Sequence, residues 1–403
     1  MLLPLLLALI SAEPADLGRD LFMHEWVPGD SRSHAGDGLG PVYNAASCVA
    51  CHPRGGASPE GDIEIITASS VSTGNMNLPN LPGFSYDASF DYDSQGGFSA
   101  QFRRPTTRPA VLSPSIADLS RIHPGFRDAP GVVLHRYGNA PAYRGWRSGV
   151  VGQHGSIVIR SSRRNPTSLF GVGLIDSIPS SAIEEAARES GGHVSRLPSG
   201  KVGRFGWKAQ VASLRDFVIQ AAAVEMGIST PGHPQSSDPI APRQDPPGLD
   251  LSAEDCDALV SFVGRLPAPL ASSPRGIAQF HAVGCARCHR PFLANVGLYS
   301  DLSLHRMSGE LSDTSSYAAF GSAPPFSASG RGDVVADEEW RTPPLWGVAD
   351  SAPYMHDGRA GSLDDAIRLH GGEASASARR YRQLSESQRA ELLAFLMSLE
   401  APK

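Results

Sequence analysis

The stretch Cys48-Val-Ala-Cys51-His52 recurs as Cys285-Ala-Arg-Cys288-His289, and these two pentads decide the fold. They contain four of the five cysteines in a chain of 403 residues. In a chain of this length, two such spaced pairs indicate a bound cofactor rather than a framework of disulfides. The fifth cysteine, Cys256, continues the apolar spacing of the helix expected around it, so we predict that it is a small packed core residue.

The chemistry of these pentads favours haem. Two thiols at positions i and i+3 can each add to one vinyl group of a porphyrin, and the following histidine then lies under the ring as an iron ligand. A zinc site made from both cysteine pairs requires two distant segments to converge and leaves both histidines unexplained. A redox dithiol is the other alternative, but neither motif ends a strand in a βαβ unit. The predicted attachment residues of two c-type haems are Cys48, Cys51, Cys285 and Cys288, with His52 and His289 as iron ligands.

The composition excludes other classes of protein. Acidic residues outnumber basic ones, 41 to 35, and no basic run occurs, which argues against a nucleic-acid surface. No apolar stretch approaches twenty residues, so we expect no membrane-spanning helix. The short apolar run Leu2–Ile10 and the residues after it are typical of an export signal, although no basic residue precedes the run. We expect residues 1–15 to be that signal and the mature protein to be periplasmic or otherwise extracytoplasmic.

The chain contains two unequal repeats. Each has a short amphipathic start, the haem motif, a hinge that contains proline, and a closing helix. The hinges are Asn165–Gly171 and Arg341–Gly347. The closing helices begin near Ser252 and Ser385, where capping-box patterns precede apolar residues at helical spacing.

The N-terminal repeat has about twice as many residues between motif and hinge, and its extra residues carry strand and helix signals. Strand-like runs occur at Asp62–Ile66 and Gly155–Arg160. A further helix is predicted from about Lys208 to Met226, with Gly227 at its C-terminal cap.

The segment Pro267–Pro274 marks the boundary between the repeats, because its prolines and small residues are typical of a linker. We therefore predict a mainly α protein with two cytochrome c-like haem domains, residues 16–268 and 269–403. The N-terminal domain is expected to be enlarged by loops and short β-strands.

Strings over nearly the whole chain resemble the di-haem oxidoreductase family, whose members are described as di-haem peroxidases or thiol oxidoreductases. The C-terminal half is also similar to the electron-transfer domain of bacterial di-haem cytochrome c peroxidases and of their methylamine-dehydrogenase-maturing relatives. The strings that carry the resemblance include Asn44–His52, Leu169–Asp176, Arg204–Gln210, Gly297–Leu302, Arg341–Gly347, Tyr354–Arg359 and His370–Glu373.

The resemblance implies an oxidoreductase that reduces hydrogen peroxide at the N-terminal haem with electrons passed through the C-terminal haem. It implies a small-molecule oxidant and an electron-donor protein, such as a small cytochrome or a cupredoxin, as partners. A calcium ion between the domains is a further candidate cofactor. The alternative function is electron transfer by a cytochrome c whose two haems are both six-coordinate, without peroxidase activity.

The resemblance also suggests the second ligand of the C-terminal iron. In the peroxidases, a helix that begins with Ser-Leu carries this ligand seven residues beyond the Leu. Here Ser362-Leu363 leads to His370, which would make the C-terminal haem bis-histidine. The alternative is that His370 only caps the end of its helix. Met307 is the fallback ligand.

The N-terminal haem departs from the peroxidase pattern, because no histidine occurs between His52 and His123. His135 and His154 are the candidate ligands or acid–base groups, although each alone is more often structural. An open sixth position is equally allowed, and peroxide chemistry needs one. The candidates for an aromatic bridge between the haems are Trp207, Trp346 and Trp146.

Overall fold

The computed structural model describes residues 14–58, 61–70, 88–92, 98–102, 115–127, 131–241, 246–269, 276–307, 309–313 and 335–402. Residues 1–13, most of the expected export signal, lie outside this set. Within the described residues, no helix has the length and apolar character needed to cross a bilayer.

The protein is helix-rich with some short strands, in agreement with the predicted class. The elements before the first hinge are α1 (Pro14–Met23), β1 (Val42–Tyr43), α2 (Cys48–Cys51), η1 (Pro53–Gly55), β2 (Ile63–Ser70), β3 (Ala88–Tyr92), β4 (Phe98–Phe102), α3 (Ile116–Ile122), η4 (Pro124–Arg127), β5 (Gly131–Val133), β6 (Tyr137–Gly138), α4 (Tyr143–Ser148), β7 (Gly152–His154) and β8 (Ile157–Arg164). Those that follow are α5 (Val172–Ser177), α6 (Ser180–Ser190), α7 (Leu214–Glu225), α8 (Ala253–Gly264), α9 (Ile277–Val283), η5 (Cys285–Arg287), β9 (Leu304–Arg306), η6 (Gly309–Leu311), β10 (Glu339–Arg341), η7 (Val348–Asp350), α10 (Leu363–Leu369), η8 (Gly372–Ala374), α11 (Ser375–Gln383) and α12 (Glu386–Met397).

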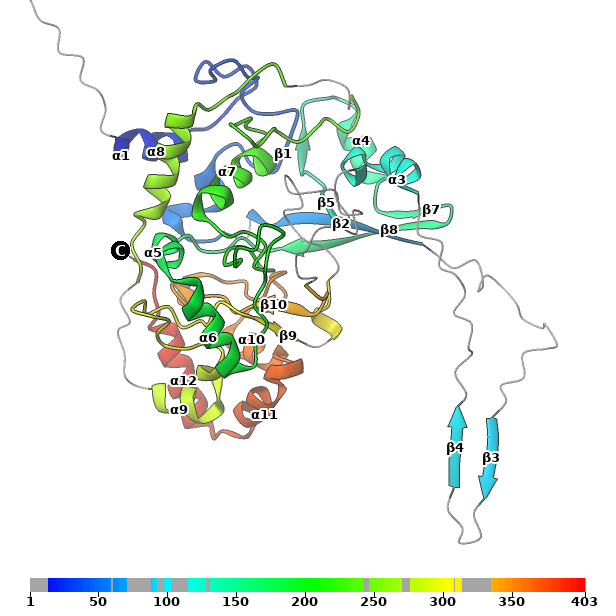
Figure 1. Ribbon diagram of the computed structural model, residues 1–403, viewed down its shortest axis with the longest axis vertical. Coiled ribbons are helices and arrows are strands. Elements are labelled where there is room, and N and C mark those ends of the chain that lie inside the picture. Colours follow the sequence, from blue (N-terminus) through cyan, green and yellow to red (C-terminus); the bar gives the residue numbers. More distant parts are fainter. Residues whose placement is uncertain are drawn as a thin grey trace, which may run out of the picture.

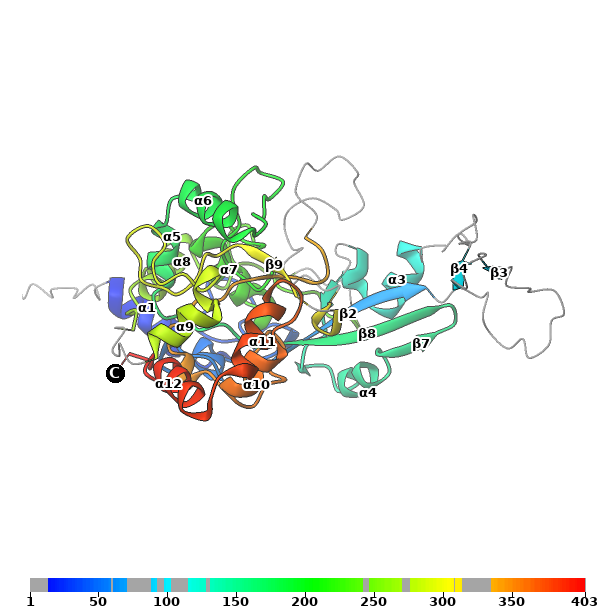
Figure 2. The ribbon, with the colours of Figure 1, turned by 90° about the horizontal axis from the view of Figure 1, so that it is seen from below.

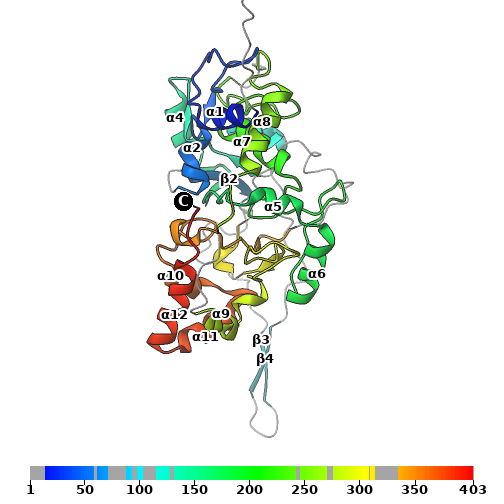
Figure 3. The same cartoon turned by 90° about the vertical axis from the view of Figure 1, so that its left-hand side faces the viewer.

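The helices gather at two ends of the molecule. Figure 1 shows α1, α7 and α8 at one end and α9 to α12 at the other, with α5 between them. Figure 3, from the side, shows the same separation. The largest hydrophobic core nevertheless joins both halves, because Leu298 and Trp346 pack with N-terminal residues such as Leu169 and Leu259. The division at residue 268 stays a prediction.

An antiparallel sheet of four strands extends from the N-terminal half, as Figure 2 shows. Its strand order is β5-β2-β8-β7, with Ile65 opposite Val133 on one side and Ser162 on the other. Ile66, Phe126 and Ile159 belong to a separate small core on this sheet. The two strand predictions in this region are confirmed by β2 and by β8.

The predicted helix from Lys208 is wrong at its start, because α7 begins only at Leu214. The side chain of Ser213 accepts a hydrogen bond from the backbone N–H of Asp216 and so caps the helix there. Before it, Gly206 and Ala209 have positive φ angles of 79° and 49°, which a helix does not allow.

The closing helices are confirmed. Both α8 and α12 begin with complete capping boxes, formed by Ser252 with Asp255 and by Ser385 with Gln388. Cys256 is only 1% exposed and lies in the large core, as its spacing predicted.

The two hinges cross each other with reciprocal contacts. The N–H of Asn165 donates to the carbonyl of His356 at 2.7 Å, and the N–H of Arg341 donates to the carbonyl of Trp207 at 2.9 Å. Each hinge ends in a glycine with positive φ, 65° at Gly171 and 63° at Gly347. The repeats are therefore joined as an approximate two-fold pair through their hinges.

These glycines are tightly enclosed. A Cβ at Gly171 would lie 2.4 Å from the Trp346 ring, and one at Gly347 would lie 2.9 Å from Phe170. We expect Gly171→Ala to lower the free energy of unfolding by about 2 kcal/mol or more, from backbone strain plus overpacking. Urea denaturation measures this free energy of unfolding. Gly361→Ala is the control, since nothing lies within 4 Å of its Cβ position; equal losses for both variants would contradict the hinge assignment.

Candidate haem sites

Each Cys-X-X-Cys-His motif lines its own cavity. The C-terminal cavity, of about 390 Å³, is lined by Cys285, Cys288 and His289. The N-terminal cavity, of about 140 Å³, is lined by Cys48, Cys51 and His52. Among the described residues, no group of three or more candidate metal ligands combines the two cysteine pairs. The arrangement therefore disfavours the four-cysteine zinc site.

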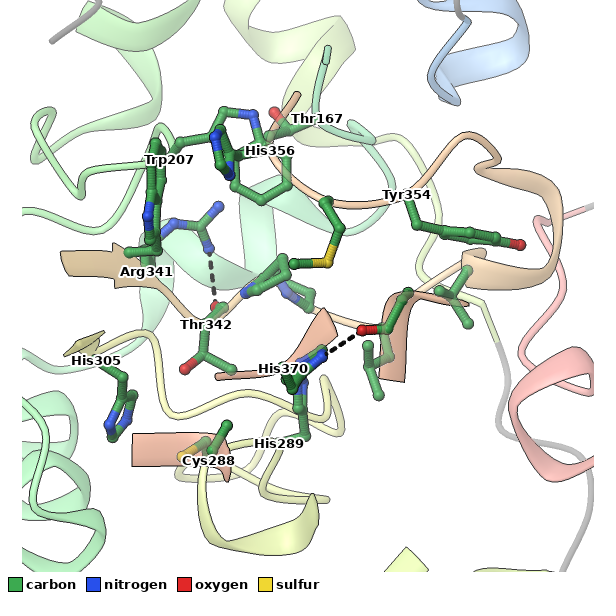
Figure 4. A pocket seen from close by; sticks show the side chains of 18 of the residues that line it. Thr167, Trp207, Cys288, His289, His305, Arg341, Thr342, Tyr354, His356 and His370 are labelled. Carbon is green, nitrogen blue, oxygen red and sulfur yellow. Dashed lines mark hydrogen bonds between the residues drawn. The ribbon is translucent and has the colours of Figure 1, made fainter. Parts of the chain in front are cut away.

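Two histidines face each other in the C-terminal cavity. The ring centroids of His289 and His370 are 6.5 Å apart, and both residues line the cavity (Figure 4). One metal ion bonded to two imidazoles at about 2 Å each needs a centroid separation of about 6 Å. The geometry therefore fits a single iron between these two rings.

Hydrogen bonds orient both rings. Nδ1 of His289 donates to the carbonyl of Tyr299 at 3.1 Å, and Nδ1 of His370 donates to the carbonyl of Ala366 at 2.7 Å. A proton on Nδ1 leaves Nε2 as the lone-pair nitrogen that a metal binds. Burial, with a smaller contribution from the neighbouring His370, lowers the pKa of His289 to about 4, and burial also lowers the pKa of His370. Both rings are thus neutral, as iron ligation requires.

His370 also follows the last residue of α10, so its bond to Ala366 meets the helix end as the capping alternative expected. The two roles are compatible, because the cap uses Nδ1 and a metal would use Nε2. Met307 lines the same cavity and keeps its place as the fallback ligand.

The N-terminal motif is prepared in the same way. Nδ1 of His52 donates to the carbonyl of Gly56 at 2.9 Å, and burial lowers the pKa of His52. Burial, with a smaller contribution from Cys51, raises the pKa of the Cys48 thiol to about 12. Burial raises that of Cys285 to about 11. These thiols are protonated near neutral pH, which disfavours a reactive dithiol.

The loops that lead into α7 and α10 follow the same backbone path. In each loop an antiparallel bridge pairs two residues that are six positions apart. The residues one and four positions after the first bridge residue have positive φ angles. A serine two residues beyond the bridge caps each helix by accepting from the N–H of an aspartate. The bridges are Phe205–Val211 and Tyr354–Ala360, the positive-φ residues are Gly206, Ala209, Met355 and Gly358, and the capping serines are Ser213 and Ser362.

This shared register aligns the two helices residue by residue. Leu214 and Leu363 are both the first helical residue and both buried. Seven residues beyond Leu363 is His370, and seven beyond Leu214 is Ala221, which lines the N-terminal cavity. The position that carries a candidate ligand in one half carries a methyl group in the other.

The N-terminal cavity is also lined by polar residues that the sequence analysis did not predict. They include Glu225, one helical turn beyond Ala221, and Gln210. A carboxylate oxygen of Glu225 accepts a hydrogen bond from Nδ2 of Asn44 at 2.6 Å. The run Val224-Glu225-Met226, at the end of the helix that repeats α10, is the signal that could have identified this carboxylate.

The two histidines predicted for this site line neither cavity. His135 is buried and its Nε2 donates to the carbonyl of Val224 at 2.8 Å. His154 lies on β7, and its Nε2 donates to the carbonyl of Val150 at 2.7 Å. Burial lowers the pKa of His135 to about 4. Both histidines therefore make structural hydrogen bonds to backbone carbonyls, which is the more common role of a lone histidine.

The three tryptophans predicted as candidates for an aromatic bridge lie in different parts of the structure. Trp207 lines both cavities, and its indole N–H donates to the carbonyl of Asn165 at 2.8 Å. Trp346 lines only the C-terminal cavity, and Trp146 packs against the small core of the sheet.

The C-terminal part of the chain matches a known family of proteins. Residues 263–399, which contain the second haem motif and His370, match the family model "Di-haem oxidoreductase, putative peroxidase". This segment is therefore similar to a di-haem oxidoreductase domain. Its family binds two haems, and the chain contains the two motifs for them.

The chain is also similar to a known protein over part of its length. Methylamine utilization protein MauG of Methylorubrum extorquens is 31% identical over 137 residues, which cover 32% of this chain and 35% of MauG. The chain therefore matches about a third of the length of this relative.

Three solved structures show weaker likeness. Hydrazine synthase of Kuenenia stuttgartiensis is 20% identical, with a TM-score of 0.32 over 59% of this chain and 73% of that chain. A MauG-like protein associated with microbial copper homeostasis is 18% identical, with a TM-score of 0.31 over 56% and 90%. A variant of the diheme peroxidase BthA of Burkholderia thailandensis is 14% identical, with a TM-score of 0.31 over 96% and 86%.

The facing rings give a spectroscopic prediction. We expect His370→Ala to remove the six-coordinate low-spin signal of one haem and leave the second haem unchanged, because one nitrogen ligand is lost. Electron paramagnetic resonance and optical spectra measure this, with Met307→Ala as the matched variant of the fallback ligand. A wild-type spectrum for His370→Ala, or loss of the signal in Met307→Ala alone, would reject the assignment.

Proposed function

We propose that this protein is an exported di-haem c-type cytochrome oxidoreductase that reduces hydrogen peroxide to water at the N-terminal cavity. Electrons would come from a donor protein and pass through the C-terminal cavity. The observation that carries the proposal is the difference between α10 and α7, which place His370 in one cavity and Ala221 at the equivalent position of the other.

This difference favours an enzyme over an electron carrier. An iron on His289 would be closed by His370, whereas an iron on His52 would face the methyl group of Ala221 and keep a position for a small oxidant. Met226 also lines the N-terminal cavity, but it belongs to the buried hydrophobic core. The alternative, a carrier cytochrome, requires a second ligand in both halves.

The residues of the N-terminal cavity fit the proton transfers that peroxide cleavage needs. A haem bound there would supply the iron that binds peroxide and the electrons that cleave the O–O bond. The Glu225 carboxylate can accept the proton of one peroxide oxygen and return it to the other oxygen, which leaves as water. Two electrons from the donor protein and two further protons would convert the remaining oxygen to a second water. Asn44 holds that carboxylate in position and lies just before the first cysteine of the motif.

The wall between the cavities fits electron transfer. Trp207 lines both of them and is fixed by the hydrogen bond from its indole to Asn165. Its ring meets that of His356 edge-on, with centroids 6.4 Å apart. Trp207 is therefore our choice for the aromatic bridge. Calcium stays a candidate cofactor from the sequence, and the proposal does not depend on it.

Exchange of the ligand pattern tests the proposal. We expect the wild-type protein to have one low-spin haem and one high-spin haem that binds cyanide and consumes peroxide. Ala221→His should convert the second haem to low spin and reduce cyanide binding and peroxide turnover by about tenfold or more, because a nitrogen ligand would compete for the iron. Two low-spin haems in the wild type, with no cyanide binding, would establish the carrier function instead.

Glu225→Gln tests the acid–base role separately. We expect kcat/KM for peroxide to fall by about a hundredfold or more, with unchanged haem spectra, because an amide cannot shuttle the proton. Stopped-flow measurement of peroxide reduction gives the rate. The matched control is Glu254→Gln, on the exposed side of α8; a similar loss in both variants, or none in Glu225→Gln, would remove Glu225 from the mechanism.

A further inference from the structure

A buried guanidinium lies beside the C-terminal cavity without a carboxylate partner. Arg341 ends β10, is 5% exposed and lines this cavity (Figure 4). Its Nε donates to the carbonyl of Gly206 at 2.7 Å, and its Nη1 lies 3.4 Å from the carbonyl of Thr342. A guanidinium offers five N–H donors, so these two bonds leave donors to spare.

The charge of Arg341 is not balanced by direct contact. Within the described residues, its hydrogen bonds reach only backbone carbonyls, and no carboxylate forms an ion pair with it. Asp301 acts on it from a greater distance and is itself bonded to His305 and Ser303. Burial lowers the pKa of Arg341 to about 10, so it is still charged at neutral pH. A buried charge of this kind is costly unless an anion pairs with it.

The other cationic side chains that line this cavity are each stabilised by a helix end, by carboxylates or by solvent. Nη1 of Arg204 donates to three carbonyls at the end of α5, where the helix dipole favours a cation. His305 lies between two carboxylates, those of Asp301 and Glu373. Arg287 and Arg380 are exposed, so water screens their charges. Arg341 differs from all four in being buried without a carboxylate, helix end or solvent to stabilise its charge.

A covalently bound haem brings its own carboxylates, the two propionates, into the cavity. We propose that Arg341 binds a propionate of the C-terminal haem and thereby raises the reduction potential of that haem relative to a site without the cation. A guanidinium fits a carboxylate through two parallel hydrogen bonds, which the spare donors of Arg341 allow. This role concerns cofactor binding and potential, and so it does not depend on peroxide being the substrate.

The two halves differ at this position as well. Asn165 and Arg341 occupy equivalent places in the hinges, since each donates its N–H across the two-fold pair. Asn165 lines both cavities and carries no charge, while Arg341 lines only the C-terminal one. At this position the C-terminal hinge therefore carries a buried cation and the N-terminal hinge a neutral amide. The buried cations that line the N-terminal cavity, Arg164 and Lys208, lie outside its hinge.

Potentiometric titration of the two-haem protein, followed optically and by electron paramagnetic resonance, tests the proposal. In Arg341→Gln we expect the reduction equilibrium of the C-terminal haem, identified as the one whose signal His370→Ala changes, to shift by about tenfold toward the oxidised form, because a nearby positive charge no longer favours the added electron. The high-spin haem should shift less. Arg287→Gln is the matched control, since it removes the same charge from an exposed residue on the same cavity.

A second variant covers the case in which Arg341→Gln does not fold with both haems. Arg341→Lys keeps the charge but cannot form two parallel bonds, so we expect a retained potential with a changed propionate band in the resonance Raman spectrum. An unshifted potential in a folded Arg341→Gln, or an unchanged propionate band in Arg341→Lys, would overturn the proposal. A two-haem protein without peroxidase activity would refute the proposed function but still permit this test.

Discussion

The crossing of the two hinges is the constraint on which both cavities depend. Asn165 donates to the loop before α10, and Arg341 donates to the loop before α7, so each hinge is held by the other half of the chain. Trp346 and Phe170 then pack over the hinge glycines Gly171 and Gly347, which have no Cβ to separate them. Each cavity wall is therefore held in part by a loop of the other repeat.

On this shared frame the two halves carry different side chains. The same helix start and the same loop conformation present His370 to one motif and Ala221 to the other. The hinge presents Arg341 to one cavity and the neutral Asn165 to its counterpart. Backbone similarity with side-chain difference thus gives the two cavities different residues at equivalent positions.

Local patterns predicted the elements that local energetics control. The capping boxes at Ser252 and Ser385 begin helices as expected, because their hydrogen bonds join residues three apart. The start of α7 was placed too early, since helical spacing continues into a loop whose Gly206 and Ala209 have left-handed backbone conformations. The sequence did not predict that Glu225 lines the N-terminal cavity and that His135 does not, because cavity lining depends on segments far apart in the chain.

The sequence by itself determined the two cysteine pairs with their histidines, the repeat that contains them and the helix that carries His370. Covalent attachment of haem needs two cysteines at a fixed short spacing, and such a spacing can be recognised directly in the sequence. Only the tertiary structure decided that the ring centroids of His289 and His370 lie 6.5 Å apart, that Trp207 lines both cavities and that Ala221 lines the cavity of the first motif. Those relations arise from hinges that cross, and packing between distant segments leaves no periodic trace in the sequence.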